Sequence, residues 1–242
     1  RLGTMDNSEF WIGGRHAVLS ASLNKKRNCE KIALLNEENE VHFANKKNIE
    51  IKDKKFFNKI FLNKDINHQG YAALIKPFKD IVFNDFLKER ENQKIIFLII
   101  DNIQDDRNIG SIIRTSVAFG VDAIIANKRE FREKSQEMYK SASGGMEFIN
   151  IIKVSNLNNA IEILKKNQVW IYGLDGNSKS SSVFKENFDK RLAFVLGSEN
   201  LGIKNLVKQN CDKILRIPIN SNIGSLNVSN AAAAILSILQ IK

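Results

Sequence analysis

Two different spacings of apolar and polar residues alternate from residue 94 to the end of the chain. Residues 95–100 form an unbroken apolar run, which is typical of a strand buried on both faces. Between residues 112 and 119 the apolar positions recur at helical spacing, and Gly120 follows where a helix commonly ends. The same alternation predicts strands at 123–125, 149–152, 170–173, 192–196 and 213–217, and helices at 135–142, 157–166, 204–210 and from 228 onward. We therefore predict an α/β domain whose parallel sheet carries helices on both faces.

The first third of the chain has a less regular pattern and predicts a separate, smaller module. Its predicted elements are helices at 17–21 and 54–62 and strands at 31–35, 40–44 and 71–75. Pro77 closes this module, and the charged stretch after it predicts a linker with a short helix at 81–90. The expected organisation is an N-terminal domain at 8–78, a linker at 79–93 and a C-terminal domain at 94–242.

Polar side chains gather at two places where chemistry is common in α/β proteins. Asn108 and Arg114 follow the strand at 95–100, on the loop and first turns of the next helix. Ser225 and Asn227 lie in a small polar run that leads directly into an Ala-rich helix. The plainer alternative is that Asn108 and Asn227 only cap helices and that Arg114 is a solvated charge.

A third polar loop follows the strand at 192–196 and superficially resembles a phosphate-binding loop. Gly197 and Gly202 bracket it, but Ile203 stands where such a loop needs lysine. No G-x-G-x-x-G follows the first strand of the sheet either. The sequence therefore disfavours both a nucleotidase and a dinucleotide-binding enzyme.

Taken together, these three segments resemble the ordered motifs of the SpoU (TrmH-like) branch of the SPOUT RNA methyltransferases. They read N-I-G-S-I-I-R-T from residue 108, L-G-S-E-N-L-G-I from residue 196, and I-P-I-N-S-N-I-G-S-L-N-V-S-N-A-A-A from residue 217. The resemblance covers roughly residues 94–242. It departs at Asn200, where the second motif usually has glycine, although asparagine tolerates left-handed backbone better than most residues. It places the family's active-site residues on Asn108, Arg114, Glu199, Ser225 and Asn227.

The resemblance implies methyl transfer from S-adenosylmethionine to a ribose 2′-hydroxyl of RNA, without a metal. It further implies that the donor lies in a deep trefoil knot of the C-terminal domain, a feature that periodicity does not reveal. The implied donor-binding residues are Gly173, Leu174, Gly197, Ile217 and Leu226. A guanidinium is effectively always charged, so we expect Arg114 to position the phosphate and the 2′-oxygen rather than to accept a proton.

The N-terminal module carries a resemblance of its own. The segments G-G-R-H-A-V from residue 13 and H-Q-G-Y-A-A-L from residue 68 are similar to the substrate-binding domain of many SpoU enzymes, which resembles a small ribosomal-protein fold. The closest match is thus the RlmB-like type, which methylates a guanosine of 23S rRNA. The alternatives are a tRNA ribose 2′-O-methyltransferase and a catalytically silent RNA-binding or ribosome-assembly protein. SpoU-like sites are completed near a partner subunit, which implies a homodimer through the C-terminal domain.

Composition agrees with an RNA-binding protein of the cytoplasm. The 242 residues carry a formal net charge of +10, which favours a polyanionic partner. The two cysteines are far apart, as expected in a reducing compartment, and together with three scattered histidines they predict no zinc site. No apolar run reaches the roughly 18 residues of a membrane span, so we expect no membrane association.

Overall fold

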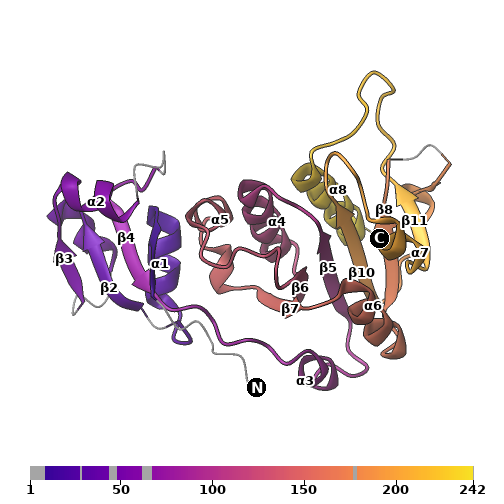
Figure 1. Ribbon diagram of the computed structural model, residues 1–242, viewed down its shortest axis with the longest axis horizontal. Coiled ribbons are helices and arrows are strands. Elements are labelled where there is room, and N and C mark those ends of the chain that lie inside the picture. The colour runs from indigo at the N-terminus through magenta and orange to yellow at the C-terminus, as the bar shows by residue number, and fades with distance from the viewer. Residues whose placement is uncertain (1–8, 28, 44–47, 62–66, 177–178, 242) are drawn as a thin grey trace. The chain divides into compact units, whose positions relative to one another are not determined.

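The chain divides into two compact units. The computed structural model describes residues 9–27, 29–43, 48–61, 67–176 and 179–241 (Figure 1). The first unit comprises residues 1–79 with 133–148, and the second comprises residues 80–132 with 149–242. The stretch 133–148 thus packs with the first unit, although the sequence pattern grouped it with the second. The predicted domain limits stay a prediction, and two of them, residues 8 and 242, lie outside the described residues.

The first unit is built on a four-stranded sheet in the order β1-β4-β2-β3. Strand β4 runs antiparallel to β1 and β2, whereas β2 and β3 are parallel. The described elements of this unit are β1 (Phe10–Gly13), α1 (Arg15–Leu23), β2 (Cys29–Leu34), η1 (Glu37–His42), β3 (Ile49–Ile51), α2 (Lys54–Ile60), β4 (Tyr71–Ile75), α5 (Gln136–Ala142) and η2 (Gly145–Glu147).

One predicted element of this unit is wrong. The strand expected at 40–44 is replaced by the 3₁₀ helix η1, and Ala44 lies outside the described residues. The helix begins with three glutamates in its first turn, and glutamate is depleted in strands. The three glutamates therefore favour the 3₁₀ helix over the strand that the short alternation of apolar residues around Val41 predicted.

A buried ion pair connects the two sequence-distant parts of the first unit. Arg27 Nη2 lies 2.8 Å from Glu147 Oε1, and both side chains are only 1% exposed. The guanidinium also donates to the carbonyl of Lys76 at 2.8 Å and stacks 3.4 Å from the ring centroid of Phe78. Removing one partner of such a pair leaves an uncompensated buried charge, which costs about 3–5 kcal/mol. This pair explains why 133–148 belongs with the N-terminal residues.

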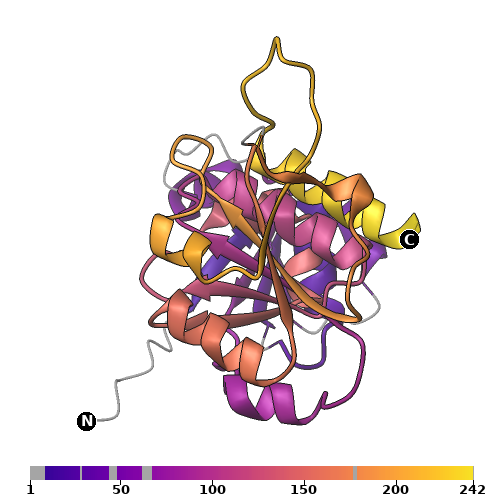
Figure 2. The ribbon, with the colours of Figure 1, turned by 90° about the vertical axis from the view of Figure 1, so that its right-hand side faces the viewer.

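The second unit contains a seven-stranded parallel sheet in the order β7-β6-β5-β10-β8-β11-β9. The parallel arrangement and six of the strands were predicted, whereas β9 was not. Helices α4 (Asp106–Ala118) and α8 (Val228–Ile241) pack together on one face, and α3 (Phe83–Lys88) and α6 (Leu157–Lys166) cover the other (Figure 2). The strands are β5 (Ile95–Asp101), β6 (Ala123–Asn127), β7 (Asn150–Val154), β8 (Trp170–Leu174), β9 (Ser181–Ser182), β10 (Arg191–Gly197) and β11 (Lys213–Arg216). The remaining described elements are η3 (Val183–Lys185) and α7 (Asn205–Gln209).

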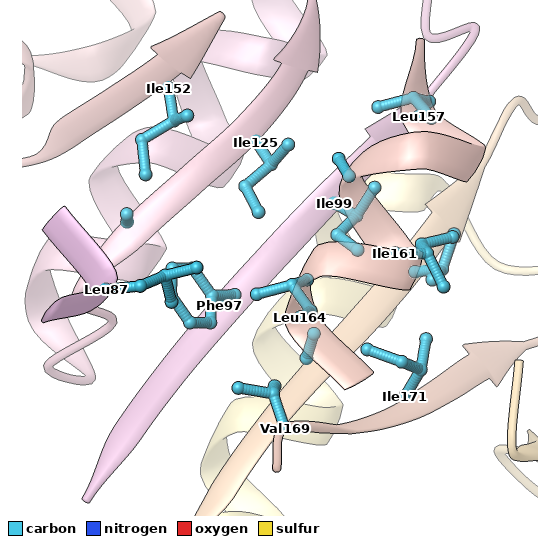
Figure 3. Packing of buried hydrophobic residues seen from close by; sticks show 14 of the residues in the cluster. Leu87, Phe97, Ile99, Ile125, Ile152, Leu157, Ile161, Leu164, Val169 and Ile171 are labelled. Atoms are coloured by element: carbon cyan, nitrogen blue, oxygen red, sulfur yellow. The ribbon is translucent and has the colours of Figure 1, made fainter. Parts of the chain in front are cut away.

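The centre of this sheet explains the unbroken apolar run of the sequence. Every residue of β5 is buried, because successive side chains point to opposite faces and helices cover both. Phe97 and Ile99 pack in one cluster with Ile161 and Leu164 of α6 (Figure 3). Because the strands are parallel, the carboxyl ends of β5, β8 and β10 lie at one edge of the sheet, where the polar loops of the sequence emerge.

Candidate active site

The loop after β10 is a tight turn that closes on its own strand. Ser198 and Gly202 exchange two backbone hydrogen bonds, of 3.1 and 2.9 Å. A Cβ atom on Gly197 would lie 2.1 Å from the carbonyl carbon of Gly202, so only glycine fits at this position. The left-handed conformation falls on Gly202, with φ +65°, and not on Asn200. The asparagine that departs from the motif therefore imposes no backbone strain.

A buried aspartate at the end of β5 anchors the far side of this loop. Asp101 is fully buried, and its Oδ2 accepts a 2.7 Å hydrogen bond from the backbone N–H of Lys204. The Lys204 ammonium lies 3.0 Å from Glu130 and 3.6 Å from Asp101, and the bond to Glu130 is the main cause of its raised pKa. Asp101 was not predicted from the sequence, where its signal was a lone acid ending an apolar strand.

Three of the five predicted active-site residues meet in one hydrogen-bonded cluster, which we call the amide–carboxylate cluster: Asn108, Glu199 and Asn227. Asn108 Nδ2 donates to Glu199 Oε1 at 3.0 Å. Asn227 Nδ2 donates to the same Glu199 oxygen at 2.5 Å and to Asn108 Oδ1 at 3.0 Å. The three side chains come from α4, from the loop after β10 and from the start of α8, so the fold joins three separate motifs at one point.

Asn227 uses its full hydrogen-bonding capacity inside the protein. Its Oδ1 accepts from the backbone N–H of Ser229 at 2.9 Å and from the Ser229 hydroxyl at 2.6 Å. With both amide hydrogens donated as well, no donor or lone pair of this side chain is left for a ligand. Asn227 is also the cap of α8, since its carbonyl accepts from Ala231 N at 2.9 Å. Asn227 is therefore both the helix cap and a member of the cluster, and its predicted role in catalysis stays a prediction. Ser229 was not predicted from the sequence.

Glu199 and Asn108, by contrast, each keep a hydrogen-bonding group that is available to a ligand. Glu199 Oε2 has no hydrogen-bond partner among the described residues, and Asn108 Nδ2 retains a second hydrogen. Asn108 is not the cap of α4, because Asp105 takes that position and accepts from Arg107 N at 2.8 Å. The alternative interpretation of Asn108 as a capping residue is wrong.

The other two predicted residues, Arg114 and Ser225, stand outside this cluster. Arg114 is exposed on α4 and makes no hydrogen bond or ion pair with any residue that the structure describes. Ser225 is exposed in the loop between β11 and α8, where it lines a cleft together with Glu199. This loop projects from the body of the unit (Figure 2).

That cleft has a volume of about 410 Å³ and gathers most of the residues predicted to hold the methyl donor. Leu174, Gly197, Ile217 and Leu226 line it. Gly173 does not, because it lies behind the wall, where a Cβ atom would meet Ile214, Cys211 and Ile203 side chains within 3.1 Å. The size and the mixed apolar and polar lining suit a small ligand with an aromatic and a charged end. We call this space the first cleft.

A charged pair that was not predicted from the sequence also lines the first cleft. Lys208 of α7 donates a hydrogen bond to Asp175, the residue that follows β8, and both side chains line the cleft wall. An acid at the end of a strand and a lysine on a short helix have no distinctive sequence signal, and only the fold brings them together.

A second cleft, of about 460 Å³, lies against the same loop. Glu199 lines both clefts, whereas Asn108 lines only the second. The loop after β10 is therefore a shared wall, and the amide–carboxylate cluster stands at this wall. Such an arrangement can hold two ligands whose reacting atoms meet at Glu199.

The described part of the chain contains neither a metal-binding group of side chains nor a membrane-spanning helix. No group of three His, Cys, Asp or Glu side chains there is placed to hold a metal ion. None of the helices in those same residues is long and apolar enough to cross a lipid bilayer.

Comparison with known proteins places this architecture in a class. A SpoU methyltransferase, AviRb from Streptomyces viridochromogenes, solved with its cofactor AdoMet, superposes with a TM-score of 0.77 over 96% of this chain and 90% of its own, at 19% identity. An RNA 2′-O ribose methyltransferase gives a TM-score of 0.79 over 96% of this chain and 88% of its own, also at 19% identity. The fold is therefore that of the SpoU-type methyltransferases.

Sequence relationships establish the family. A profile described as the SpoU rRNA Methylase family matches residues 95–237. A protein of Staphylococcus saprophyticus that is assigned to the TrmH family of tRNA/rRNA methyltransferases is 35% identical over 238 residues, which cover 94% of each chain. The chain belongs to the SpoU rRNA methylase family. This membership confirms the predicted SpoU (TrmH-like) branch and the predicted enzyme class.

Proposed function

We propose that this protein transfers a methyl group from S-adenosylmethionine to a ribose 2′-hydroxyl of RNA, most specifically to a guanosine of 23S rRNA. The observation that carries the proposal is the amide–carboxylate cluster, which stands at the wall shared by the two clefts. One cleft suits the donor and the other suits the acceptor. Holding two reactants in line is the main requirement of such a displacement.

The first cleft fits the methyl donor, which supplies an electrophilic methyl group on a sulfonium when it is bound. Leu174, Ile217 and Leu226 offer apolar contacts, and Asp175 with Lys208 adds opposite charges to the same lining. Adenine needs the apolar contacts, while the ribose hydroxyls and the amino-acid end need the charged groups. The knotted crossing of the C-terminal segment is part of the same proposal and is supported by the family membership.

On the acceptor side, the cluster supplies the groups that orient the hydroxyl. Glu199 Oε2 accepts the hydrogen bond of the 2′-hydroxyl, which turns an oxygen lone pair toward the donor. Asn108 braces the loop and donates its second N–H to the substrate. Asn227 keeps Glu199 and Asn108 in place and contacts neither reactant, because its hydrogen bonds are all used within the protein. Ser225, on the rim of the first cleft, adds a hydroxyl beside the ribose.

Arg114 contributes positive charge for the phosphate and for the developing alkoxide. It is exposed on the helix that carries Asn108, and no described residue neutralises it. A guanidinium fork suits two oxygens at once, which the point charge of lysine does not reproduce. In this role Arg114 makes no contact with the methyl donor.

A homodimer through the second unit is also proposed. Helix α8 is apolar on nearly every side, yet only Val228, Ala232, Ile235 and Leu236 are buried in it, and Ile241 is 83% exposed. A helix that is apolar all round is normally covered on all sides. Light scattering at micromolar concentration should show a dimer, and a fully active monomer would contradict this.

The choice of RNA substrate and the cellular location are also proposed. The first unit adds phosphate contacts and selects the RNA, as the net charge of +10 favours. The two widely separated cysteines favour a reducing, cytoplasmic setting. Mapping the methylated nucleotide after incubation with unmodified total RNA tests the choice of 23S rRNA. Label confined to tRNA would favour the tRNA enzyme instead.

The test of the site itself is Arg114→Ala, compared with Arg114→Lys and with Arg129→Ala as a control. Arg129 is an exposed arginine of the same unit that follows β6, whereas Arg114 lies on the helix that carries Asn108. Arg114→Ala should lower turnover about 100-fold or more, the scale for losing one preorganised electrostatic donor, and lysine should restore only part of it. Donor affinity should not change. Normal turnover of Arg114→Ala, or loss of donor binding, would contradict the role. Failure of the wild-type chain to bind S-adenosylmethionine at millimolar concentration would favour a silent RNA-binding protein.

A further inference from the structure

The second cleft carries an inference about base recognition, which rests on the proposed function. Its lining comes from the segment 102–105, from the shared loop 198–201, and from Asn108 and Val228. We propose that this cleft receives the target nucleoside as an unstacked base and that Gln104 and Asp105 select guanine.

The cleft has an apolar lining suited to the faces of a base. Ile103 and Val228 line it and are only 6% and 5% exposed, whereas Leu201 is 79% exposed. An enzyme that modifies one nucleotide commonly takes its base out of the stack and holds it between apolar side chains. Leu201 belongs to the shared loop, so a base against it lies next to Glu199.

Two polar side chains on the wall of the second cleft, Gln104 and Asp105, keep hydrogen-bonding groups that a ligand can use, one a donor and the other an acceptor. Asp105 Oδ1 accepts from Arg107 N at 2.8 Å and lies 3.6 Å from Arg107 Nε in an exposed ion pair, but Oδ2 has no hydrogen-bond partner among the described residues. Gln104 Nε2 donates one hydrogen to Asn102 Oδ1 at 2.8 Å, which leaves its second hydrogen for a ligand. Asp105 Oδ1 also keeps a second lone pair, so the wall presents a carboxylate that can accept two hydrogen bonds and one neighbouring donor.

Guanine matches this pair better than the other three bases. Its Watson–Crick edge carries two adjacent N–H donors, which a carboxylate accepts, and one carbonyl oxygen, which an amide N–H can reach. Adenine and cytosine turn a ring-nitrogen acceptor toward the carboxylate, which repels it, and uracil offers only one N–H donor. With the base held by Gln104 and Asp105, the ribose falls toward Asn108 and Glu199 in the same cleft.

The decisive variant is Asp105→Asn, because it changes recognition without removing the helix cap. Asparagine caps helices about as well as aspartate, so the bond to Arg107 N is kept while the free carboxylate oxygen becomes an amide. The ion pair with the Arg107 side chain is lost, but both side chains are exposed and such a pair adds little stability. Asp85→Asn is the matched control, since Asp85 is an exposed acid in the first turn of α3 and makes the same charge change outside both clefts. Each protein receives unmodified total RNA and labelled S-adenosylmethionine, and the RNA is then digested to nucleosides.

The wild type and Asp85→Asn should label 2′-O-methylguanosine. Asp105→Asn should label it roughly 5- to 150-fold more slowly, the range for removing one bidentate interaction with a base, with unchanged melting temperature and donor affinity. An Asp105→Asn variant that labels guanosine at the wild-type rate would overturn the proposal. So would wild-type label in another nucleoside. A wild type that binds the donor but labels no RNA would overturn the proposed function itself, a result distinct from either of these.

Discussion

Removal of the Ser229 hydroxyl should slow methyl transfer without affecting the methyl donor. The hydroxyl and the backbone N–H of Ser229 both donate to Asn227 Oδ1, at 2.6 and 2.9 Å. These two bonds determine which end of the Asn227 amide faces Glu199 and Asn108. Ser229→Ala deletes one of them, and the amide then loses part of the preference for its working orientation. Ser229 lines neither cleft, so any effect passes through Asn227.

The expected magnitude follows from the value of one hydrogen bond. A net loss of about 0.5–1.5 kcal/mol corresponds to roughly a 2- to 12-fold decrease in rate, at tenfold for each 1.4 kcal/mol. Asn227→Asp should be far worse, by roughly 100-fold, because it sets a second carboxylate at 2.5 Å from Glu199. Its rate should recover as the pH falls, since two carboxylates that close share a proton.

Single-turnover methyl transfer at saturating donor measures the chemical step, and calorimetry measures donor affinity separately. Ser229→Thr keeps the hydroxyl and should restore most of the rate. A purely structural role would lower the melting temperature and the donor affinity together and would not respond to threonine. The reasoning is refuted if Ser229→Ala transfers methyl groups at the wild-type rate, or if threonine is as slow as alanine.

Three further outcomes are expected. Gly197→Ala should abolish donor binding and lower the melting temperature, because its Cβ would lie within 2.4 Å of backbone atoms at Gly202 and the next residue; calorimetric donor affinity near the wild-type value would contradict this. Replacing the exposed Lys55 and Lys59 of α2 by glutamine should flatten the salt dependence of RNA binding by roughly 0.7 to 0.9 log units for each phosphate that is no longer neutralised, with unchanged donor affinity. Burial raises the pKa of the Cys211 thiol from 9.0 to about 12, so the stability that its neutral form contributes is complete below pH 9 and is lost as the pH rises toward 12; urea unfolding of Cys211→Ala should therefore lose less stability than the wild type between pH 9 and 11.

Local sequence determined most elements of the second unit. The apolar run at 95–100 needed no tertiary information to be a buried strand, because every position of β5 faces a helix layer. The alternation of strands and helices likewise set the parallel sheet, and helix α6 has the predicted bounds of 157–166. The three motifs indicated where the polar residues would gather, because loops at the carboxyl ends of parallel strands share one edge.

The sequence pattern did not predict some features of the first unit, because the interactions that cause them join residues far apart in the chain. The ion pair between Arg27 and Glu147 joins residues 120 positions apart, and it buries two charges that the pattern would assign to the surface. Nothing near residue 147 predicts this partner. Packing of 133–148 with the N-terminal residues is thus a property of the folded unit.

At the site, the sequence supplied the residue types and the tertiary structure assigned their partners. Asn108 and Asn227 are 119 residues apart, and no spacing rule predicts that one amide would exhaust its hydrogen bonds on the other, on Glu199 and on Ser229. The fold also placed Gly173 behind the first cleft rather than in its lining. Sequence patterns report which side chains are polar and where strands end, whereas the direction and saturation of a hydrogen bond depend on atoms that only the folded chain brings within about 3 Å of each other.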